Sequence, residues 1–220
     1  MPSAPSNMTK RIYKPAIPHF EPIGHLYHDD AGTFLESSTT ILKAELGLYQ
    51  FSSNKAAGRG TEVHKAAHYY DDGDLNEASL TDEVAGYLEQ YKKALAFYKI
   101  KVHANELMRY SRKYLFAGTC DKVVTIAGEH GPLDLKTGSV EKWHKWQTAS
   151  YYDLLAEEFE KLHGLKFSKR WALYVSPANF CLVEHKGARD LTEFLTFLAS
   201  HNLKINNGYR KSKAETNGGN

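Results

Sequence analysis

The stretch from Gly118 to Gly138, GTCDKVVTIAGEHGPLDLKTG, places an aspartate on each side of a predicted turn. Two alternating segments, CDKVVTIAG and PLDLKTG, flank the turn-forming residues AGEHGP and predict a β-hairpin. Asp121 opens the first strand and Asp134 lies on the second, so antiparallel pairing can bring both carboxylates within reach of one cation. Lys136 follows Asp134 by two residues and therefore shares its face of the strand.

Two carboxylates this close repel each other unless a cation joins them. Mg²⁺ takes oxygen ligands, often one or two protein carboxylates with water and substrate phosphate. Such an ion lowers the pKa of an attacking water and neutralises charge during phosphodiester hydrolysis, and the Lys136 ammonium can orient that water or stabilise the transition state. The alternative is that Asp121, Asp134 and Lys136 are exposed strand residues in a salt-linked face, and this short pattern alone favours that alternative.

A second stretch, GRGTEVHKAAH, supplies candidate imidazole ligands. Helical spacing sets His64 and His68 one turn apart, with Gly60 one turn earlier, where a residue without a side chain permits close approach. A histidine ligand suits a site that takes Mn²⁺. The pattern is not that of a zinc protease, because Lys65 stands where the catalytic glutamate would be. A packed or surface histidine is the alternative, favoured for His68 and evenly weighted for His64.

A third stretch, EKWHKWQTASYY, predicts a helix that presents Gln147 and Tyr151 on one face. At its start, cations and aromatic rings interleave, a mixture that suits phosphate contact and base stacking; the candidates are Lys142, Lys145 and Trp146. For the tryptophan, a core anchor is an equally good interpretation. Arg109 and Arg112 in RYSRKY form a second candidate segment for phosphate contact, unless they only mark a solvent-facing side.

Composition indicates a soluble globular protein with one domain. The chain has 220 residues, 42% of them hydrophobic and 25% charged. No apolar run approaches the ~20 residues needed to span a bilayer, and the N-terminus lacks the apolar segment of a secretory signal. Two cysteines, Cys120 and Cys181, exclude a disulfide framework, so we expect a cytoplasmic setting without a membrane partner. The net charge of +2 means that a nucleic-acid partner must be held by a local basic patch.

The predicted elements define a mixed α/β fold. Turn signals and periodicity indicate hairpins over 24–37 and 170–186, strands over 107–118, 120–128 and 132–138, and helices over 38–49, 54–73, 81–100 and 140–164. A last helix is expected to carry Leu191, Phe194, Leu195 and Leu198 at core spacing. Ser38 or Thr39 is the expected N-cap of the first helix. We expect an extended arm over residues 1–20, one domain over 21–208 and a flexible tail over 209–220.

Taken together, the ordered motifs resemble the PD-(D/E)XK nuclease superfamily, in its RecB-like branch of phage-type exonucleases. The motifs are Gly60-x-x-x-His64, Gly118-x-x-Asp121, Asp134-x-Lys136-Thr137-Gly138 and Gln147-x-x-x-Tyr151. They lie within a resemblance that runs from about Tyr27 to Leu155. It implies an α/β fold with a restriction-endonuclease-like core, in which helices flank a central mixed β-sheet.

The resemblance also implies a role for each matched position. The Mg²⁺ or Mn²⁺ cofactor would be held by His64, Asp121, Asp134 and the backbone carbonyl of Leu135. Lys136 would position or activate water, and Gln147 and Tyr151 would support the site and contact the DNA strand. Glu106 matches, loosely, an acidic position that some members carry upstream.

The chain departs from the CRISPR-associated members, which carry four cysteines for an iron–sulfur cluster. The smaller phage-type enzymes are therefore the nearer comparison. The expected function is that of a divalent-metal-dependent deoxyribonuclease, an exonuclease acting on linear DNA ends in recombination or repair. A structure-specific endonuclease and a non-catalytic DNA-binding accessory protein are the alternatives. DNA is the expected partner, a single-strand annealing or recombination protein is a further candidate, the oligomeric state stays open, and a phage-encoded protein would act in the host cytoplasm.

Overall fold

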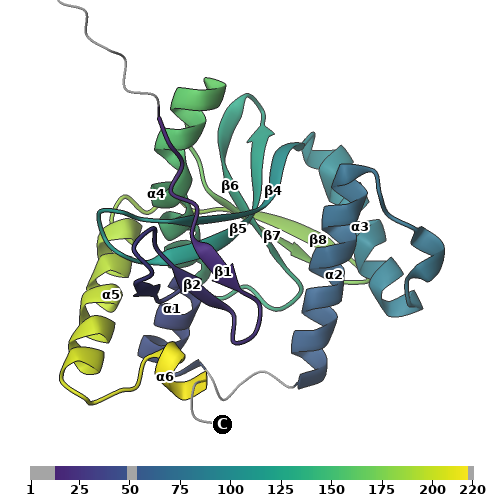
Figure 1. The fold of residues 1–220 in the computed structure, drawn as a ribbon. Coiled ribbons are helices and arrows are strands. Elements are labelled where there is room, and N and C mark those ends of the chain that lie inside the picture. The colour runs from purple at the N-terminus through teal and green to yellow at the C-terminus, as the bar shows by residue number, and fades with distance from the viewer. Residues whose placement is uncertain (1–12, 49–53, 218–220) are drawn as a thin grey trace, which may run out of the picture.

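A five-stranded sheet forms the centre of the structure, a computed structural model that describes residues 13–48 and 54–217 (Figure 1). Its strand order is β4-β5-β6-β7-β8, with bounds Lys101–Tyr110, Ala117–Ile126, Glu129–Lys136, Trp171–Val175 and Phe180–Glu184. Only the β6–β7 pair is parallel in this sheet, and the long helix α4 (His144–His163) connects those two strands. The expectation of an α/β fold with a central mixed sheet flanked by helices is therefore confirmed.

Helices cover the sheet on both sides and bury two apolar clusters. One cluster lies beneath α2 (Asn54–Asp72) and α3 (Asp82–Tyr98) and includes Leu133 and Leu135 of β6. The other lies beneath α1, α4 and α5, with bounds Ser38–Leu46, His144–His163 and Asp190–Asn206. Because strand side chains alternate, Asp134 and Lys136 leave β6 on the face opposite Leu133 and Leu135.

The helix ends follow local capping chemistry. Thr81 accepts a hydrogen bond from the Val84 amide and begins α3, and Gly164, with φ 68°, ends α4 in the left-handed conformation. The N-cap of α1 is Ser37, whose side chain accepts from the Thr40 amide, so the expectation of Ser38 or Thr39 is wrong by one or two residues. Ser37 is still extended, with ψ 149°, whereas the helix starts at the next residue.

A small sheet of three short strands packs against the main domain. Its strands are β1 (His19–Glu21), β2 (Leu26–His28) and β3 (Phe34–Leu35), all antiparallel. The Asp29 carboxylate accepts from the amides of Ala31 and Thr33, which fixes the turn between β2 and β3. The hairpin predicted around Asp-Asp-Ala-Gly is therefore confirmed.

The strand predicted over 107–118 is wrong, because that segment contains the end of β4, a turn and the start of β5. The Ser111 amide donates to the Phe116 carbonyl at 2.8 Å, and the Ser111 hydroxyl accepts from the Tyr114 amide. These bonds close a loop around the polar residues that break the alternation. The β5–β6 turn consists of Ala127 and Gly128, both with positive φ, as a two-residue hairpin turn requires.

The ends of the domain carry further structure. Residues 209–217, within the segment expected as a tail, include the short helix α6 (Lys213–Asn217), and the Lys213 amide donates to Glu36 Oε1 at 2.8 Å. Of the segment expected as an arm, residues 1–12 lie outside the described residues, and β1 begins at His19. The division into arm, domain and tail stays a prediction.

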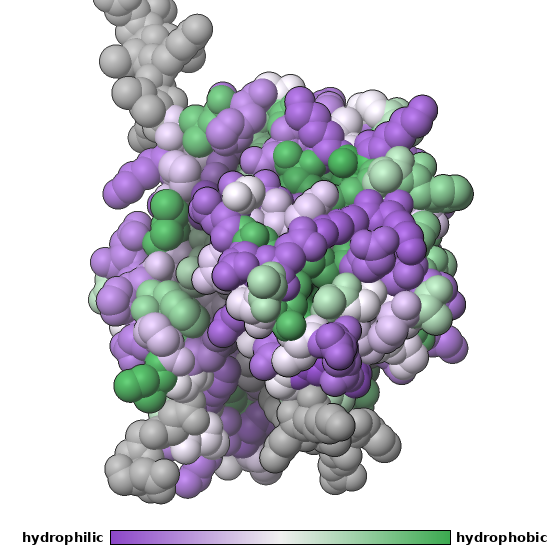
Figure 2. All heavy atoms as spheres, turned by 90° about the vertical axis from the view of Figure 1, so that its right-hand side faces the viewer, coloured by the Kyte–Doolittle hydropathy of each residue, from purple (hydrophilic) through white to green (hydrophobic). Residues whose placement is uncertain are grey.

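The face formed by α2 and α3 is mostly hydrophilic, with smaller apolar areas between (Figure 2). Phe97 of α3 is exposed at 71%.

Among the described helices, none combines the length and the apolar character that crossing a bilayer would require.

Candidate metal centre

One acidic pair and a histidine from three elements meet beside the sheet. The register of β4 and β5 pairs Asn105 with Lys122 and Leu107 with Cys120, which sets Glu106 opposite Asp121. His64 reaches the same place from α2. One ligand atom from each of His64, Glu106 and Asp121 lies within 4.8 Å of the other two, and His64 Nδ1 is 3.5 Å from Asp121 Oδ1. Two carboxylates and an imidazole offer the donor set of a hard or borderline divalent cation.

Asp121 is held in its charged form by its neighbours. Burial acts to raise the pKa of this carboxyl, but the attraction of His64 and Lys136 and a hydrogen bond from the Leu135 amide outweigh it and lower the pKa to about 2. The Leu135 N–H donates to Asp121 Oδ2 at 2.7 Å. One Asp121 oxygen is therefore committed to β6, while the other faces His64.

Glu106 carries the opposite shift. Burial, followed by the negative charge of Asp121, raises the pKa of Glu106 to about 7. Its backbone has φ 47°, a left-handed conformation that a glutamate in a strand rarely adopts. The strand therefore holds Glu106 in a strained backbone conformation beside a carboxylate that repels it, and a bound cation would relieve this repulsion.

The buried Asp134 and the partly buried Lys136 form an ion pair at the end of β6. Lys136 Nζ lies 2.6 Å from Asp134 Oδ2, and the Asp134 side chain is 1% exposed. Burial raises the pKa of Asp134 to about 7 against the opposing influence of Lys136. The Asp134 oxygens fall outside the group of three ligand atoms, so the structure groups Glu106 rather than Asp134 with His64 and Asp121.

A chain of side-chain hydrogen bonds continues from Lys136 into α4. Lys136 Nζ donates to Gln147 Oε1 at 2.9 Å. Gln147 Nε2 donates to the Tyr151 hydroxyl at 2.8 Å and to Thr39 Oγ1 at 3.1 Å. Both Gln147 and Tyr151 are buried. The helix spacing seen in the sequence thus becomes one connected network around the lysine.

Two glycines of the motifs permit close approach of backbone to neighbouring side chains. A Cβ at Gly118 would lie 3.0 Å from Ser38 Oγ and 3.1 Å from the Tyr151 ring. A Cβ at Gly60 would lie 3.3 Å from Thr137 Oγ1, directly after Lys136. The spacing of Gly60 before His64 therefore brings α2 against the end of β6.

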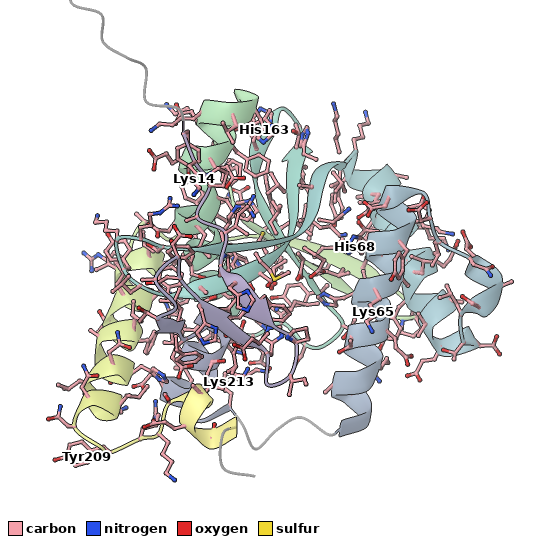
Figure 3. The ribbon with its side chains drawn as sticks, viewed as in Figure 1. Lys14, Lys65, His68, His163, Tyr209 and Lys213 are labelled. Carbon is pink, nitrogen blue, oxygen red and sulfur yellow. The ribbon has the colours of Figure 1, made fainter. Side chains whose placement is uncertain are left out.

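The second histidine of α2 lies outside this group. His68 Nε2 contacts Asp72 Oδ2 at 2.9 Å, one turn along the same helix. Figure 3 labels His68 and Lys65 on α2. The structure therefore agrees with the interpretation of His68 as a packed or surface histidine, whose partner Asp72 lies on the same helix.

Four of the five residues expected to contact DNA are paired with acidic side chains. Arg109 makes two hydrogen bonds of 2.6 Å to Glu158, with side chains 11% and 4% exposed. Glu193 accepts from Lys145 at 2.9 Å and from the Trp146 indole at 2.6 Å. The Arg109–Glu158 pair joins β4 to α4, and Glu193 joins α5 to α4. Arg109, Lys145 and Trp146 therefore make contacts that hold the fold together.

Two of the five expected DNA contacts, Arg112 and Lys142, lie at the surface. Arg112 donates to the carbonyls of Lys14 and Pro15 and lies 3.6 Å from the Asp30 carboxylate, and its side chain is about half exposed. Lys142 is exposed just before α4. Lys142 is therefore the candidate in this set best placed to meet a solvent-borne phosphate.

The sequence matched one residue of this site, Glu106, only loosely and gave no sign of another, Thr39. Glu106 lies outside every local pattern, and its place opposite Asp121 follows only from the β4–β5 register. Thr39 enters the network from α1, 108 residues before Gln147. A search for an acidic residue on the strand before Asp121 could have identified Glu106 as a candidate ligand. No sequence signal indicates Thr39.

Comparison with known proteins does not identify a family. No protein-family model matches the chain, and no curated protein matches it. Among solved structures, the crystal structure of a protein called SSO0001 is similar at 14% identity and a TM-score of 0.35, over 76% of this chain and 85% of that one. A likeness this weak supports no conclusion about fold or function.

Proposed function

We propose that this protein is a divalent-metal-dependent deoxyribonuclease with a restriction-endonuclease-like core, acting as an exonuclease on linear DNA ends in recombination or repair. The observation that carries the proposal is the grouping of His64, Glu106 and Asp121 beside the Asp134–Lys136 pair. The order of the motifs along the chain also supports the proposal. Each motif lies on an element that contributes a residue to this centre. Host cytoplasm is the setting that fits a phage-type enzyme.

The residues present fit Mg²⁺ or Mn²⁺. Glu106 and Asp121 supply oxygen donors and His64 a nitrogen donor, and repulsion between the two carboxyls favours a cation there. When bound, the ion would lower the pKa of a water and neutralise charge on the scissile phosphate. The Leu135 amide fixes the orientation of Asp121, which supports the proposal that this carboxylate is a ligand.

Lys136 is placed to act on the attacking water or the phosphate. Its ammonium is held between Asp134 and Gln147, and Gln147 is itself fixed by Thr39 and Tyr151. A cation fixed in this way stabilises developing negative charge without reorganising during the reaction. Asp134 supplies the counter-charge that keeps Lys136 in the partly buried site.

The test is digestion of end-labelled linear duplex DNA beside a covalently closed circle, with Mg²⁺, Mn²⁺ or EDTA. We expect shortening of the linear substrate alone, dependent on metal, and a loss of about 10²- to 10³-fold in Lys136→Ala. Lys166→Ala is the matched control, because Lys166 is an exposed lysine outside the centre. It should digest as the wild type does.

Other outcomes separate the alternatives. Cutting of the closed circle would show an endonuclease that uses the same residues. A folded protein that binds DNA but cuts nothing with either metal would contradict the enzymatic proposal and leave an accessory DNA-binding protein.

A further inference from the structure

A second group of polar side chains lies on the same three elements as the candidate metal ligands. This group, which we call the Lys122 cluster, has one member from each element: Asp71 of α2, Asn105 of β4 and Lys122 of β5. Asp71 lies two turns after His64 on α2. Asn105 directly precedes Glu106, and Lys122 directly follows Asp121. Every residue of the metal-ligating group therefore has a near neighbour in the Lys122 cluster.

One ammonium joins the three elements. Lys122 Nζ donates to Asp71 Oδ2 and, at 2.9 Å, to Asn105 Oδ1. It also lies 5.2 Å from the centre of the Tyr91 ring, and the Tyr91 hydroxyl donates to Asp71. The side chains of Lys122 and Asp71 are 3% and 4% exposed. Directional bonds to a single buried charge thus fix the positions of α2, β4 and β5 relative to one another.

The side chain of Asn105 is bonded on both sides. Its Oδ1 accepts from Lys122, and its Nδ2 donates to Asp72 Oδ1 of α2 at 3.0 Å. The next residue is Glu106, with its left-handed φ of 47°. A strained backbone of this kind persists only where its surroundings hold it in place. The two bonds of Asn105 hold β4 at the residue before Glu106, which lies opposite Asp121.

Stability alone gives no reason for an ion pair at this position. Taking two charges out of water costs free energy, and well-packed apolar side chains in place of a buried ion pair often leave a protein equally or more stable. Tyr91 and Val124, which belong to the apolar cluster beneath α2 and α3, show that this side of the sheet accommodates such side chains. What the charges add is direction, because hydrogen bonds fix distances and angles that apolar contacts leave variable.

We propose that Lys122 is a positioning residue, which sets the relative places of the three metal ligands by holding Asp71 and Asn105. Lys122 is not itself a ligand, since an ammonium has no lone pair to offer a cation. The inference rests on the metal centre of the proposed function. It does not depend on cleavage of DNA, because the affinity for Mn²⁺ alone reports the geometry of the ligands.

The first experiment separates positioning from stability by removing both buried charges at once. The triple variant Tyr91→Phe/Asp71→Leu/Lys122→Met leaves neither an unpaired charge nor an unpaired tyrosine hydroxyl, so its free energy of unfolding should stay close to that of the wild type. Calorimetric titration with Mn²⁺ should nevertheless give an affinity at least about tenfold weaker, as expected when the residues that orient metal ligands are lost.

Tyr91→Phe alone is the matched control. It removes a hydrogen bond to the same Asp71 carboxylate, but from α3, which contributes no residue to the metal-ligating group. It should bind Mn²⁺ as the wild type does. Should the triple variant not fold, Asn105→Ala tests the same link, because it leaves the Lys122–Asp71 pair intact and frees β4 from it. This variant should also weaken Mn²⁺ binding about tenfold.

The second readout is a coupling that a loss of stability would not produce. Glu106→Gln should weaken Mn²⁺ binding at least about tenfold in the wild type, but less than about threefold in Asn105→Ala, where Glu106 is no longer held in place. Equal factors in the two backgrounds would overturn the proposal. Wild-type Mn²⁺ affinity in both the triple variant and Asn105→Ala would overturn it as well.

A failure of the proposed function gives a different pattern. Mn²⁺ binding by the wild type with weak binding by the two variants supports the positioning role, even where the wild type cuts no DNA. Absence of Mn²⁺ binding by the folded wild type would overturn the metal centre and the positioning role together.

Discussion

Lys136 Nζ lies 2.6 Å from Asp134 Oδ2, and the two residues are separated by one position on β6. Strand alternation places both on the face opposite Leu133 and Leu135, and the same ammonium also bonds Gln147 of α4. The pair therefore joins the sheet to the helix that supports the candidate centre. Its short spacing explains why a brief local pattern in the sequence could indicate it.

Glu106→Gln should weaken Mn²⁺ binding by at least about tenfold, because it removes a charged oxygen donor opposite Asp121. Calorimetric titration of the folded variant with Mn²⁺ gives the affinity directly. Glu62→Gln, on the exposed side of α2, is the matched control and should leave the affinity unchanged. Wild-type affinity in Glu106→Gln would remove Glu106 from the ligand set.

Arg109→Met should destabilise the protein by about 3–5 kcal/mol, because it leaves the Glu158 carboxylate buried without its partner. Chemical denaturation measures this change in the free energy of unfolding. The double variant Arg109→Met/Glu158→Leu should recover most of the loss, since no uncompensated charge remains. A stable Arg109→Met variant with weakened DNA binding would instead support the role in phosphate contact that the sequence indicated.

The free energy of unfolding should fall as the pH becomes acidic, because of Glu45. Burial acts to raise the pKa of this carboxyl, but bonds from Lys204, Ser200 and Arg210 prevail and lower it from 4.5 to about 2. Because the folded pKa is below the unfolded one, the stabilisation is present above about pH 4.5 and is lost as the pH falls towards 2. Lys204 is partly exposed, so screening limits the loss between about pH 5 and pH 3 to roughly 1 to 2 kcal/mol.

Unfolding of the wild type and of Glu45→Gln across this pH range tests the assignment to Glu45. The variant should be less stable near neutral pH and should lose less stability on acidification. Parallel pH profiles of the two proteins would show that another carboxyl is responsible.

Gly118→Ala should destabilise the protein by about 1–3 kcal/mol, because the added Cβ would lie close to Ser38 Oγ and the Tyr151 ring. Gly58→Ala is an instructive contrast, since that helical position has no atom within 4 Å of the added Cβ. It should stabilise the protein by up to about 1 kcal/mol through helix propensity. Thermal unfolding of both variants checks the two signs; equal effects would show that the close approach at Gly118 is unimportant.

Much of the fold could be predicted from local patterns. Thr81 before α3 and Gly164 after α4 sit where capping chemistry places them. The turn expected over AGEHGP is shorter in the structure, because β6 begins at Glu129 and leaves only Ala127 and Gly128 between the strands. The predicted strand over 107–118 was wrong because hydrogen bonds at Ser111 close a loop between β4 and β5, and strand period does not predict such a loop.

The sequence by itself determined which residues alternate on β6 and which lie one turn apart on α2 and α4, because these relations depend on strand and helix period alone. Only the tertiary structure decided which residues meet across different elements. Glu106 lies opposite Asp121, and Glu158 forms an ion pair with Arg109. Thr39 accepts a hydrogen bond from Gln147. Each of these contacts depends on strand register or helix packing between distant segments. No local period encodes such relations, since they arise from the joint burial of apolar faces across the whole sheet.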